Sequence, residues 1–179
     1  MIYFTADTHF NHDINKHFKR PFETLEQMNE TLIKNWNLRV NENDEIYILG
    51  DFYVGNNISD VEMILKKLNG RKYFIKGNHD KFLENESFNK NYFEWIKEYY
   101  VLNYEKINIV LFHYPILIWD GFFENMAIHL YGHIHNMLGN KNELEKIEGI
   151  LGIKTLNVGV DINSYSPISI VEILNKIQI

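Results

Sequence analysis

The sequence lacks several features that assign proteins to familiar classes. None of its 179 residues is a cysteine, which excludes disulfides, thiolate metal sites and cysteine nucleophiles. No apolar run is long enough to span a membrane, and Asp7 and His9 interrupt the region where a signal peptide would need its apolar stretch. The chain contains no repeat, low-complexity tract or segment that resembles a domain linker. These absences lead us to expect a soluble cytoplasmic protein with no membrane partner.

The composition is that of one folded domain. A length of 179 residues predicts a single domain over residues 1–179, and a hydrophobic content of 45% is enough for a substantial core. The formal net charge of −6 argues against an extended nucleic-acid surface, because such surfaces are typically basic. A nucleic-acid polymer is therefore not the expected partner.

Short apolar runs, each followed by side chains that can bind metals, dominate the pattern. The runs occupy residues 2–4, 46–49, 73–75, 109–112 and 128–131 and are typical of buried strands. The donor side chains that follow these runs are Asp7, His9, Asp51, Asn78, His113, His133 and His135. Since open α/β sheets bind ligands at the carboxyl ends of their strands, we predict that all seven meet at one site. Imidazole, carboxylate and amide donors favour manganese, iron or zinc over calcium or magnesium.

Two local arrangements suggest how the donors are shared. Asp7 and His9 are two residues apart, and so are His133 and His135. Side chains at that spacing in a strand point the same way, so each pair is expected to point to one side, and Asp7 and His9 to grip one cation. Asp51 follows a glycine that allows a sharp turn, and its two carboxylate oxygens can bridge two cations.

Five motifs in a fixed order identify a family resemblance. They are Asp7-Thr8-His9, Gly50-Asp51, Gly77-Asn78-His79-Asp80, His113 after Phe112, and Gly132-His133-Ile134-His135. This set resembles the calcineurin-like metallophosphoesterase superfamily, and the resemblance runs from Asp7 to His135. The opening stretch, residues 3–22, further resembles a small bacterial and phage branch of predicted phosphoesterases.

The resemblance implies both a fold and a metal centre. The fold would be a four-layer α/β/β/α sandwich, in which two mixed β-sheets are flanked by helices. The cofactors would be two divalent metal ions, with manganese expected first and iron, zinc, nickel and cobalt compatible with the same donors. The first ion is implied to bind Asp7, His9, Asp51 and His135, and the second Asp51, Asn78, His113 and His133. A hydroxide bridging the ions would be the nucleophile, so no separate protein base is needed.

His79 and Asp80 are the predicted catalytic residues beside the ligands. His79 directly follows Asn78, and the resemblance implies that it protonates the leaving oxygen or stabilises the phosphoryl charge. Histidine suits that role because it is the usual residue for proton transfer near neutral pH. Asp80 is predicted to orient His79; the alternative is that it only begins the following turn.

The segment from Phe10 to Arg20 is polar and basic. It contains His12, His17, Lys19 and Arg20. One reading is a solvated connection before a helix. The other is a lip of the site, in which His12 or Arg20 touches a phosphate oxygen, since the guanidinium fork suits that contact. His12 and Arg20 are therefore the candidate substrate contacts.

Capping patterns and periodicity predict the remaining elements. Helices are expected to open at Thr24, Ser59 and Ser169, each followed three residues later by Gln or Glu. Residues 99–114 predict a β-hairpin, residues 155–160 a further strand, and residues 141–148 a solvated loop or short helix. His129, inside an apolar run, is expected to be a core histidine. The polar stretch 85–91 is expected to be a loop that could join the rim of the site.

The function predicted from these residues is hydrolysis of a phosphate ester. A phosphodiester is favoured over a monoester, because a dianionic monoester needs cationic groups beyond the metals. Near the motifs only Lys19, Arg20, Lys76 and Lys81 are candidates. The expected partner is a small phosphate ester, with a nucleotide among the possibilities, in an open site. Two alternatives remain: a non-catalytic protein-binding module with the same fold, and a nuclease of the same superfamily.

Overall fold

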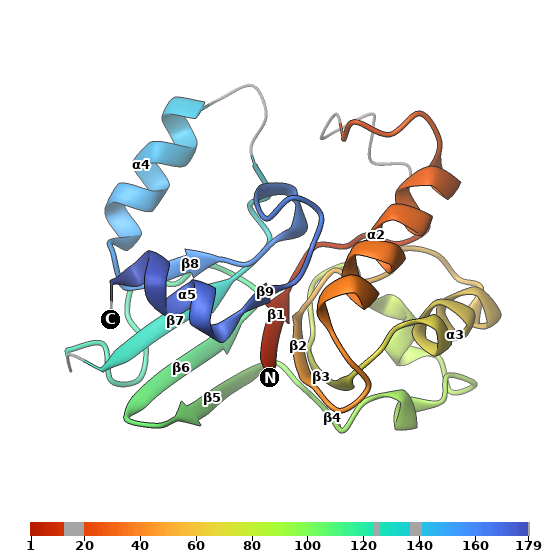
Figure 1. Cartoon of the computed structure of the whole chain (residues 1–179), viewed down its shortest axis with the longest axis horizontal. Coiled ribbons are helices and arrows are strands. Elements are labelled where there is room, and N and C mark those ends of the chain that lie inside the picture. The colour runs from red at the N-terminus through yellow and green to blue at the C-terminus, as the bar shows by residue number, and fades with distance from the viewer. Residues whose placement is uncertain (13–19, 124–125, 137–140, 179) are drawn as a thin grey trace.

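The computed structural model describes residues 1–12, 20–123, 126–136 and 141–178 and contains two mixed β-sheets flanked by helices (Figure 1). The strands are β1 (Ile2–Thr5), β2 (Glu45–Leu49), β3 (Arg71–Ile75), β4 (Trp95–Lys97), β5 (Tyr99–Tyr104), β6 (Ile107–Phe112), β7 (Ala127–Tyr131), β8 (Thr155–Asn157) and β9 (Ile168–Ser169). The helices are α2 (Leu25–Arg39), α3 (Ile58–Lys67), α4 (Lys141–Leu151) and α5 (Ile170–Ile177), with 3-10 turns at Lys81–Glu84, Lys90–Tyr92 and Val160–Ile162. This architecture confirms the predicted fold class.

The topology directs the carboxyl ends of several strands to one edge of the molecule. In the first sheet the order is β4-β3-β2-β1-β9; β1 to β4 are parallel and β9 is antiparallel to β1. In the second the order is β5-β6-β7-β8, with β6, β7 and β8 parallel and β5 antiparallel to β6. The segments that follow β1, β2, β3, β6 and β7 carry all seven predicted ligands.

Alternation along the strands divides the core into layers. Phe4, Leu49 and Leu130 are fully buried between the two sheets, and α5 adds Ile173 to the same cluster. The opposite face of the first sheet packs against α2 and α3, where Trp36 is 1% exposed. Burying a large apolar side chain in this way contributes roughly 1.5–3 kcal/mol. The sheets are therefore fixed relative to one another, which sets the spacing of the loops at their ends.

Two of the three predicted helix starts are confirmed, and one is wrong. Thr24 caps α2 by accepting a hydrogen bond from the Gln27 amide, and Ser169 caps α5 in a reciprocal capping box with Glu172. The third helix, α3, is capped by Asn57 instead of Ser59. Asparagine is as good a cap as serine, and it comes first along the chain.

The predictions for the second half of the chain are largely confirmed. Strands β5 and β6 form the expected antiparallel hairpin, with Glu105 in a left-handed conformation at the turn. Residues 141–148 belong to helix α4, and the strand predicted over 155–160 ends at Asn157. His129 is fully buried, and its two ring nitrogens lie 3.2 Å from the carbonyl oxygens of Val110 and Tyr114. It is a core histidine, as expected.

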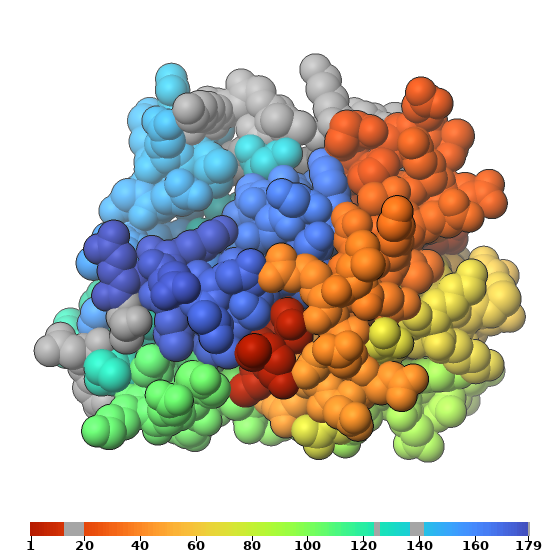
Figure 2. Space-filling view, in the orientation of Figure 1, coloured from red at the N-terminus to blue at the C-terminus, as the bar shows by residue number. Residues whose placement is uncertain are grey.

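The N-terminal residues reach the surface between two later parts of the chain (Figure 2). Figure 2 shows the C-terminal part of the chain (blue) beside α2 and the segment that follows it (orange), with the N-terminal residues (red) reaching the surface between them. None of the helices in the described residues is both long enough and apolar enough to cross a membrane.

Candidate metal centre

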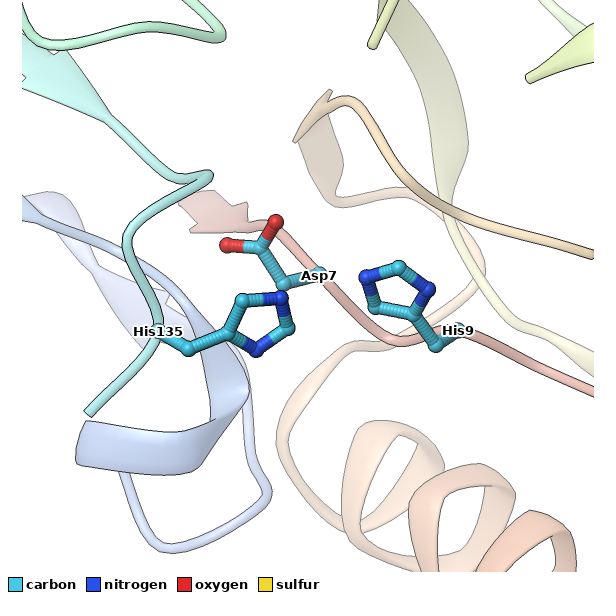
Figure 3. Close-up of side chains that lie close together, drawn as sticks. All are labelled: Asp7, His9 and His135. Carbon is cyan, nitrogen blue, oxygen red and sulfur yellow. The ribbon is translucent and has the colours of Figure 1, made fainter. Parts of the chain in front are cut away.

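The loops at the strand ends bring six of the predicted ligands into two neighbouring groups. The first group is Asp7, His9 and His135, and the second is Asp51, His113 and His133. Within each group the candidate donor atoms lie within 4.8 Å of one another. Asn78 joins the second group, because its side-chain oxygen is 3.1 Å from His113 Nε2. Figure 3 shows the first group, with Asp7 and His9 on the segment after β1 facing His135 on the loop after β7.

Five of these residues have an unusual backbone conformation. Ten of the described non-glycine residues have a positive φ, and Asp7, His9, Asp51, His133 and His135 are among them, with φ between 47° and 71°. Such conformations cost about 1–3 kcal/mol each and concentrate at functional sites. The clustering of this strain on the candidate ligands therefore points to a functional centre.

The left-handed conformations overturn one prediction from strand parity. From strand parity His133 and His135 were expected to point the same way, but His135 belongs to the first group and His133 to the second, which is the division that the family resemblance implied. The reason is that β7 ends at Tyr131, so these residues do not alternate as strand residues do. Asp7 and His9 do converge, although they too lie beyond their strand.

Glycines allow the ligand loops to approach each other closely. A Cβ on Gly50 would lie 2.5 Å from His113 Nδ1, and the φ of Gly50 is +83°. A Cβ on Gly77 would lie 2.4 Å from Asp51 Oδ1. Neither position has room for a side chain, so the two glycines are required by packing around Asp51 and His113.

Hydrogen bonds set the histidine tautomers for metal binding. His113 Nδ1 lies 2.8 Å from the carbonyl oxygen of Leu49, and His135 Nδ1 lies 2.7 Å from Asp161 Oδ2. Both nitrogens therefore donate, which in a neutral ring leaves the lone pair on Nε2 for a cation. His9 Nε2 is buried with no hydrogen-bond partner among the described residues, a state that costs about 1–3 kcal/mol unless a cation satisfies it. The donor set thus fits bound metal.

The two groups meet at Asp51. Its Oδ2 is 3.5 Å from His9 Nε2 and 3.6 Å from His113 Nε2. One carboxylate oxygen therefore stands between an imidazole of the first group and an imidazole of the second.

The carboxylates of the two groups differ in their electrostatics. Burial raises the pKa of Asp7 to about 6, although the neighbouring His135 and His113 oppose this. Burial also acts on Asp51, but a hydrogen bond and the charge of His113 outweigh it and lower its pKa to about 2. Burial, followed by the proximity of His135, lowers the pKa of His9 well below its usual value, so this ring is neutral as a ligand must be.

Asp80 has a different role from the one predicted. Its carboxylate is fully buried and accepts hydrogen bonds from the backbone N–H groups of Asp51, Phe52 and Gly77 at 2.7–2.9 Å. Burial raises the pKa of Asp80 to about 7, although these backbone donors lower it. Asp80 therefore shapes the loop that carries Asp51 and does not orient the His79 ring. The structure agrees better with the alternative prediction, in which Asp80 begins the next turn, because a 3-10 turn starts at Lys81.

Arg20 is also placed differently from the prediction. Its side chain is fully buried, and its guanidinium donates to Asp161 and to the carbonyl oxygens of Asp7 and Thr8. It therefore faces the interior instead of a substrate phosphate. His17 and Lys19, from the same predicted lip, lie outside the described residues.

Asp161 is a residue that sequence reasoning missed. It binds both Arg20 and His135, although it stands 26 residues beyond that histidine. A signal was present, because Asp161 follows an apolar strand end as Asp7 and Asp51 do. Applying the same rule to the predicted strand over 155–160 would have identified it.

An open hollow gives access to both groups. Its volume is about 390 Å³, and its lining residues are His9, His12, Asp51, Asn78, His79, His133 and His135. The His79 and His12 rings lie 5.3 Å from the His9 ring, centroid to centroid. Tyr114, which sequence reasoning did not select, packs edge-on against His133, and its hydroxyl lies 3.4 Å from the Asn78 oxygen. A larger hollow of about 480 Å³, between α4, β8 and α5, contains none of the predicted site residues.

Taken together, the fold and the site define a class: an α/β sandwich with two adjacent histidine–carboxylate groups that could hold metal ions at its strand ends. The sequence model of the calcineurin-like phosphoesterase family matches residues 1–154. The chain belongs to this metal-dependent family, which confirms the resemblance seen in the motifs.

The chain is also similar to individual proteins, two of them over almost its whole length. MJ1445, an uncharacterized protein of Methanocaldococcus jannaschii, is 37% identical over 180 residues, which cover 99% of this chain and 91% of that protein. The gene 66 protein of Mycobacterium phage L5 is 31% identical over 80 residues, 44% of this chain and 39% of that protein. The crystal structure of AQ665, a protein of unknown function from Aquifex aeolicus, has a TM-score of 0.72 at 31% identity and covers 98% of both chains.

Proposed function

We propose that the protein hydrolyses phosphate esters with two adjacent divalent cations and prefers phosphodiesters to monoesters. The position of Asp51 Oδ2 carries the proposal, since it is 3.5 Å from His9 Nε2 and 3.6 Å from His113 Nε2. A shared oxygen of this kind suits two cations about 3.5–4 Å apart. When bound, such a pair supplies a hydroxide at neutral pH and neutralises charge on the phosphoryl oxygens.

The ligand assignment follows the two groups. The first cation would be held by Asp7, His9, His135 and Asp51, and the second by Asp51, Asn78, His113 and His133. Manganese is the first choice, and iron, zinc, nickel and cobalt accept the same mixture of imidazole and oxygen donors.

We assign to His79 the transfer of a proton to the leaving oxygen. Its ring is exposed in the hollow, edge-on to His9. Its backbone N–H donates to Asp51 Oδ1 at 2.8 Å, so the residue is fixed relative to the bridging carboxylate. A proton donor at that position would assist departure of a poor leaving group.

His12 is the proposed substrate contact. Its Nδ1 lies 3.3 Å from His9 Nδ1. If His9 binds a cation through Nε2, its Nδ1 carries the proton and donates to His12. His12 also lines the hollow beside His79, and on this position we propose that it contacts the substrate.

The charge of the hollow favours a singly charged phosphodiester. The described lining contains histidines, Asp51 and Asn78 but no lysine or arginine. Arg20 is directed into the protein, and Lys76 is paired with Glu84 at 2.9 Å. A dianionic monoester would therefore find little added cationic charge beyond the metals.

Tyr114 suggests how the rest of the substrate is held. Its partly exposed ring borders the second ligand group and offers a flat apolar surface to an aryl group or a nucleobase. We therefore propose a small diester, such as a nucleotide, as substrate. Tyr114→Ala should raise KM for such substrates, whereas Tyr114→Phe, which keeps the ring, should not.

A paired assay tests the proposal. The metal-free protein would be loaded with Mn²⁺ and given bis(4-nitrophenyl) phosphate or 4-nitrophenyl phosphate at saturating metal. We expect hydrolysis of both, with the larger kcat/KM for the diester. A preference for the monoester would contradict the proposed substrate class but not the proposed two-metal hydrolysis.

Two further measurements separate the alternative functions. Metal-loaded protein that hydrolyses neither ester would support a non-catalytic binding module. Cleavage of single-stranded DNA faster than of the small diester would support a nuclease; we expect the reverse, because the described lining has no basic track for a strand.

A further inference from the structure

A buried ion pair joins two segments that are far apart in the sequence. Arg20 Nε and Nη2 donate to the two oxygens of Asp161 at 2.8 and 2.9 Å. Both side chains are fully buried, and the residues are 141 positions apart. Two parallel bonds fix the orientation of both groups, because the guanidinium fork matches a carboxylate.

The other N–H groups of Arg20 hold the loop that carries Asp7. Nη2 donates to the Asp7 carbonyl oxygen at 2.5 Å, and Nη1 donates to the Thr8 carbonyl oxygen at 2.8 Å and to Met28 Sδ at 3.5 Å. All five guanidinium donors thus have protein partners. Arg20 therefore stabilises the left-handed backbone conformation at Asp7.

Asp161 extends the contact to the loop after β7. Its Oδ2, which already accepts from Arg20, also accepts from His135 Nδ1 at 2.7 Å. The carboxylate fixes both the ring orientation and the tautomer, so His135 Nε2 is directed toward Asp7 and His9. Burial raises the pKa of Asp161, but the hydrogen bonds from His135 and Arg20 outweigh it and keep the carboxylate ionised.

We propose that Arg20 and Asp161 are positioning residues that build the first ligand group, Asp7, His9 and His135, for its cation. Arg20 sets the backbone of Asp7, and Asp161 sets the ring of His135, so one buried ion pair aligns ligands from two different loops. The inference rests on the proposed two-metal function. It assigns neither residue a contact with substrate.

Metal binding tests this inference without an activity assay. Free Mn²⁺ would be followed by its six-line EPR signal while each variant is titrated. The wild type is expected to bind two ions, and Asp161→Asn to bind one of them about 10–100-fold more weakly, the usual effect of removing a carboxylate behind a metal-bound histidine. The other ion should bind with unchanged affinity.

A second variant separates positioning from folding, since Asp161→Asn leaves the Arg20 charge buried without its partner. The double variant R20Q/D161N removes both charges, and its fold would be checked by circular dichroism. If the ion pair serves only stability, a folded double variant should bind both ions like the wild type, and that result would overturn the inference. We expect it to retain the same selective loss of one ion.

Double-mutant cycles that combine D161N with substitutions of the candidate metal ligands show whether Asp161 acts through His135. Adding D161N to H135A should weaken metal binding no further, whereas adding it to H133A should. Equal additional losses in both backgrounds would contradict the positioning role. Asp44→Asn is the matched control: Asp44 is also a paired carboxylate, but it precedes β2, at the opposite end of the strand from Asp51.

The outcome for the wild type keeps the two proposals distinct. A wild-type protein that binds no Mn²⁺ would contradict the two-metal function, and the inference would fall with it. Two ions bound by the wild type and by D161N with equal affinity would contradict the inference alone.

Discussion

The two ligand groups differ in how they are exposed and how they are held. Asp7, His9 and His135 are all buried, whereas the second group contains the partly exposed His133 and the exposed Asn78. His135 is held by the side chain of Asp161, and the corresponding partner of His113 is the backbone oxygen of Leu49. A buried group braced by side chains suits a permanently bound cation, and an open group suits a cation that meets the substrate.

The pKa values of the two carboxylates, Asp7 and Asp51, show the same contrast between the groups. Asp7 is enclosed, so burial raises its pKa to about 6, whereas His113 and the His79 backbone N–H help to lower that of Asp51 to about 2. We therefore expect the first group to bind a cation more tightly, because metal would replace the proton that burial favours on Asp7. The following predictions test this difference between the groups.

The largest effect is expected at the carboxylate that the two groups share. Asp51→Asn removes the negative charge between the cations, so metal content should fall below two ions per chain. Turnover should fall by more than the ~10²–10⁴-fold typical of losing one acid–base group. Elemental analysis and kcat would be compared with those of Asp44→Asn. Unchanged metal content in D51N would contradict the bridge.

His79→Ala should lower turnover by about 10²–10⁴-fold while both ions stay bound. The variant retains the backbone N–H that donates to Asp51, so the metal centre should stay intact. The loss should shrink for nitrophenolate, which leaves without protonation, and grow for alkoxide leaving groups. Lys81→Ala, at an exposed neighbouring position, serves as the control. A loss that does not depend on the leaving group would indicate phosphate positioning instead of acid catalysis.

The stability of the metal-free protein should depend on pH through Asp7. Its folded-state pKa of about 6 exceeds the unfolded value, so the folded state binds the proton more tightly. The free energy of unfolding should therefore fall by about 3 kcal/mol between pH 3 and pH 7 from this group alone. Urea unfolding of the wild type and Asp7→Asn would give the contribution as a difference. Parallel pH profiles for the two proteins would contradict it.

The smallest predicted effect is the order of metal loss. A chelator should remove the cation of the exposed group first, with the two apparent affinities separated by about 10-fold, or about 1.4 kcal/mol. His133→Ala should widen that separation, and His135→Ala should narrow or reverse it. The metal retained per chain would be measured at increasing chelator concentration. Simultaneous loss of both ions from the wild type would show that the difference in burial does not set the affinities.

Local patterns predicted much of this fold because their physical causes are local. Short apolar runs identified β1, β2 and β3, and the spacing of a hydroxyl and a carboxylate identified the start of α5. The start of α3 was misplaced because Asn57 provides an equivalent cap two residues earlier. Competing caps of similar strength cannot be ranked from residue type alone.

The donors of the candidate site were predictable, but their partners were not. Residue chemistry and position after a strand selected all seven candidate ligands, and the structure brings them together. The same reasoning predicted that Arg20 contacts the substrate and that Asp80 orients His79. Both side chains are instead buried and form hydrogen bonds with backbone groups. Its position after a strand could have identified Asp161, but its partners could not be predicted, because they lie 26 and 141 residues away.

The sequence by itself determined the fold class, the family and the side chains available to bind metal. Strand parity alone did not separate His133 from His135; the tertiary structure does, and it places His135 with Asp7 as the family resemblance implied. The physical reason is that these loops adopt left-handed backbone conformations, in which strand alternation no longer gives the direction of a side chain. That conformation is stabilised by contacts such as Arg20 with the Asp7 carbonyl, which exist only after the chain has folded.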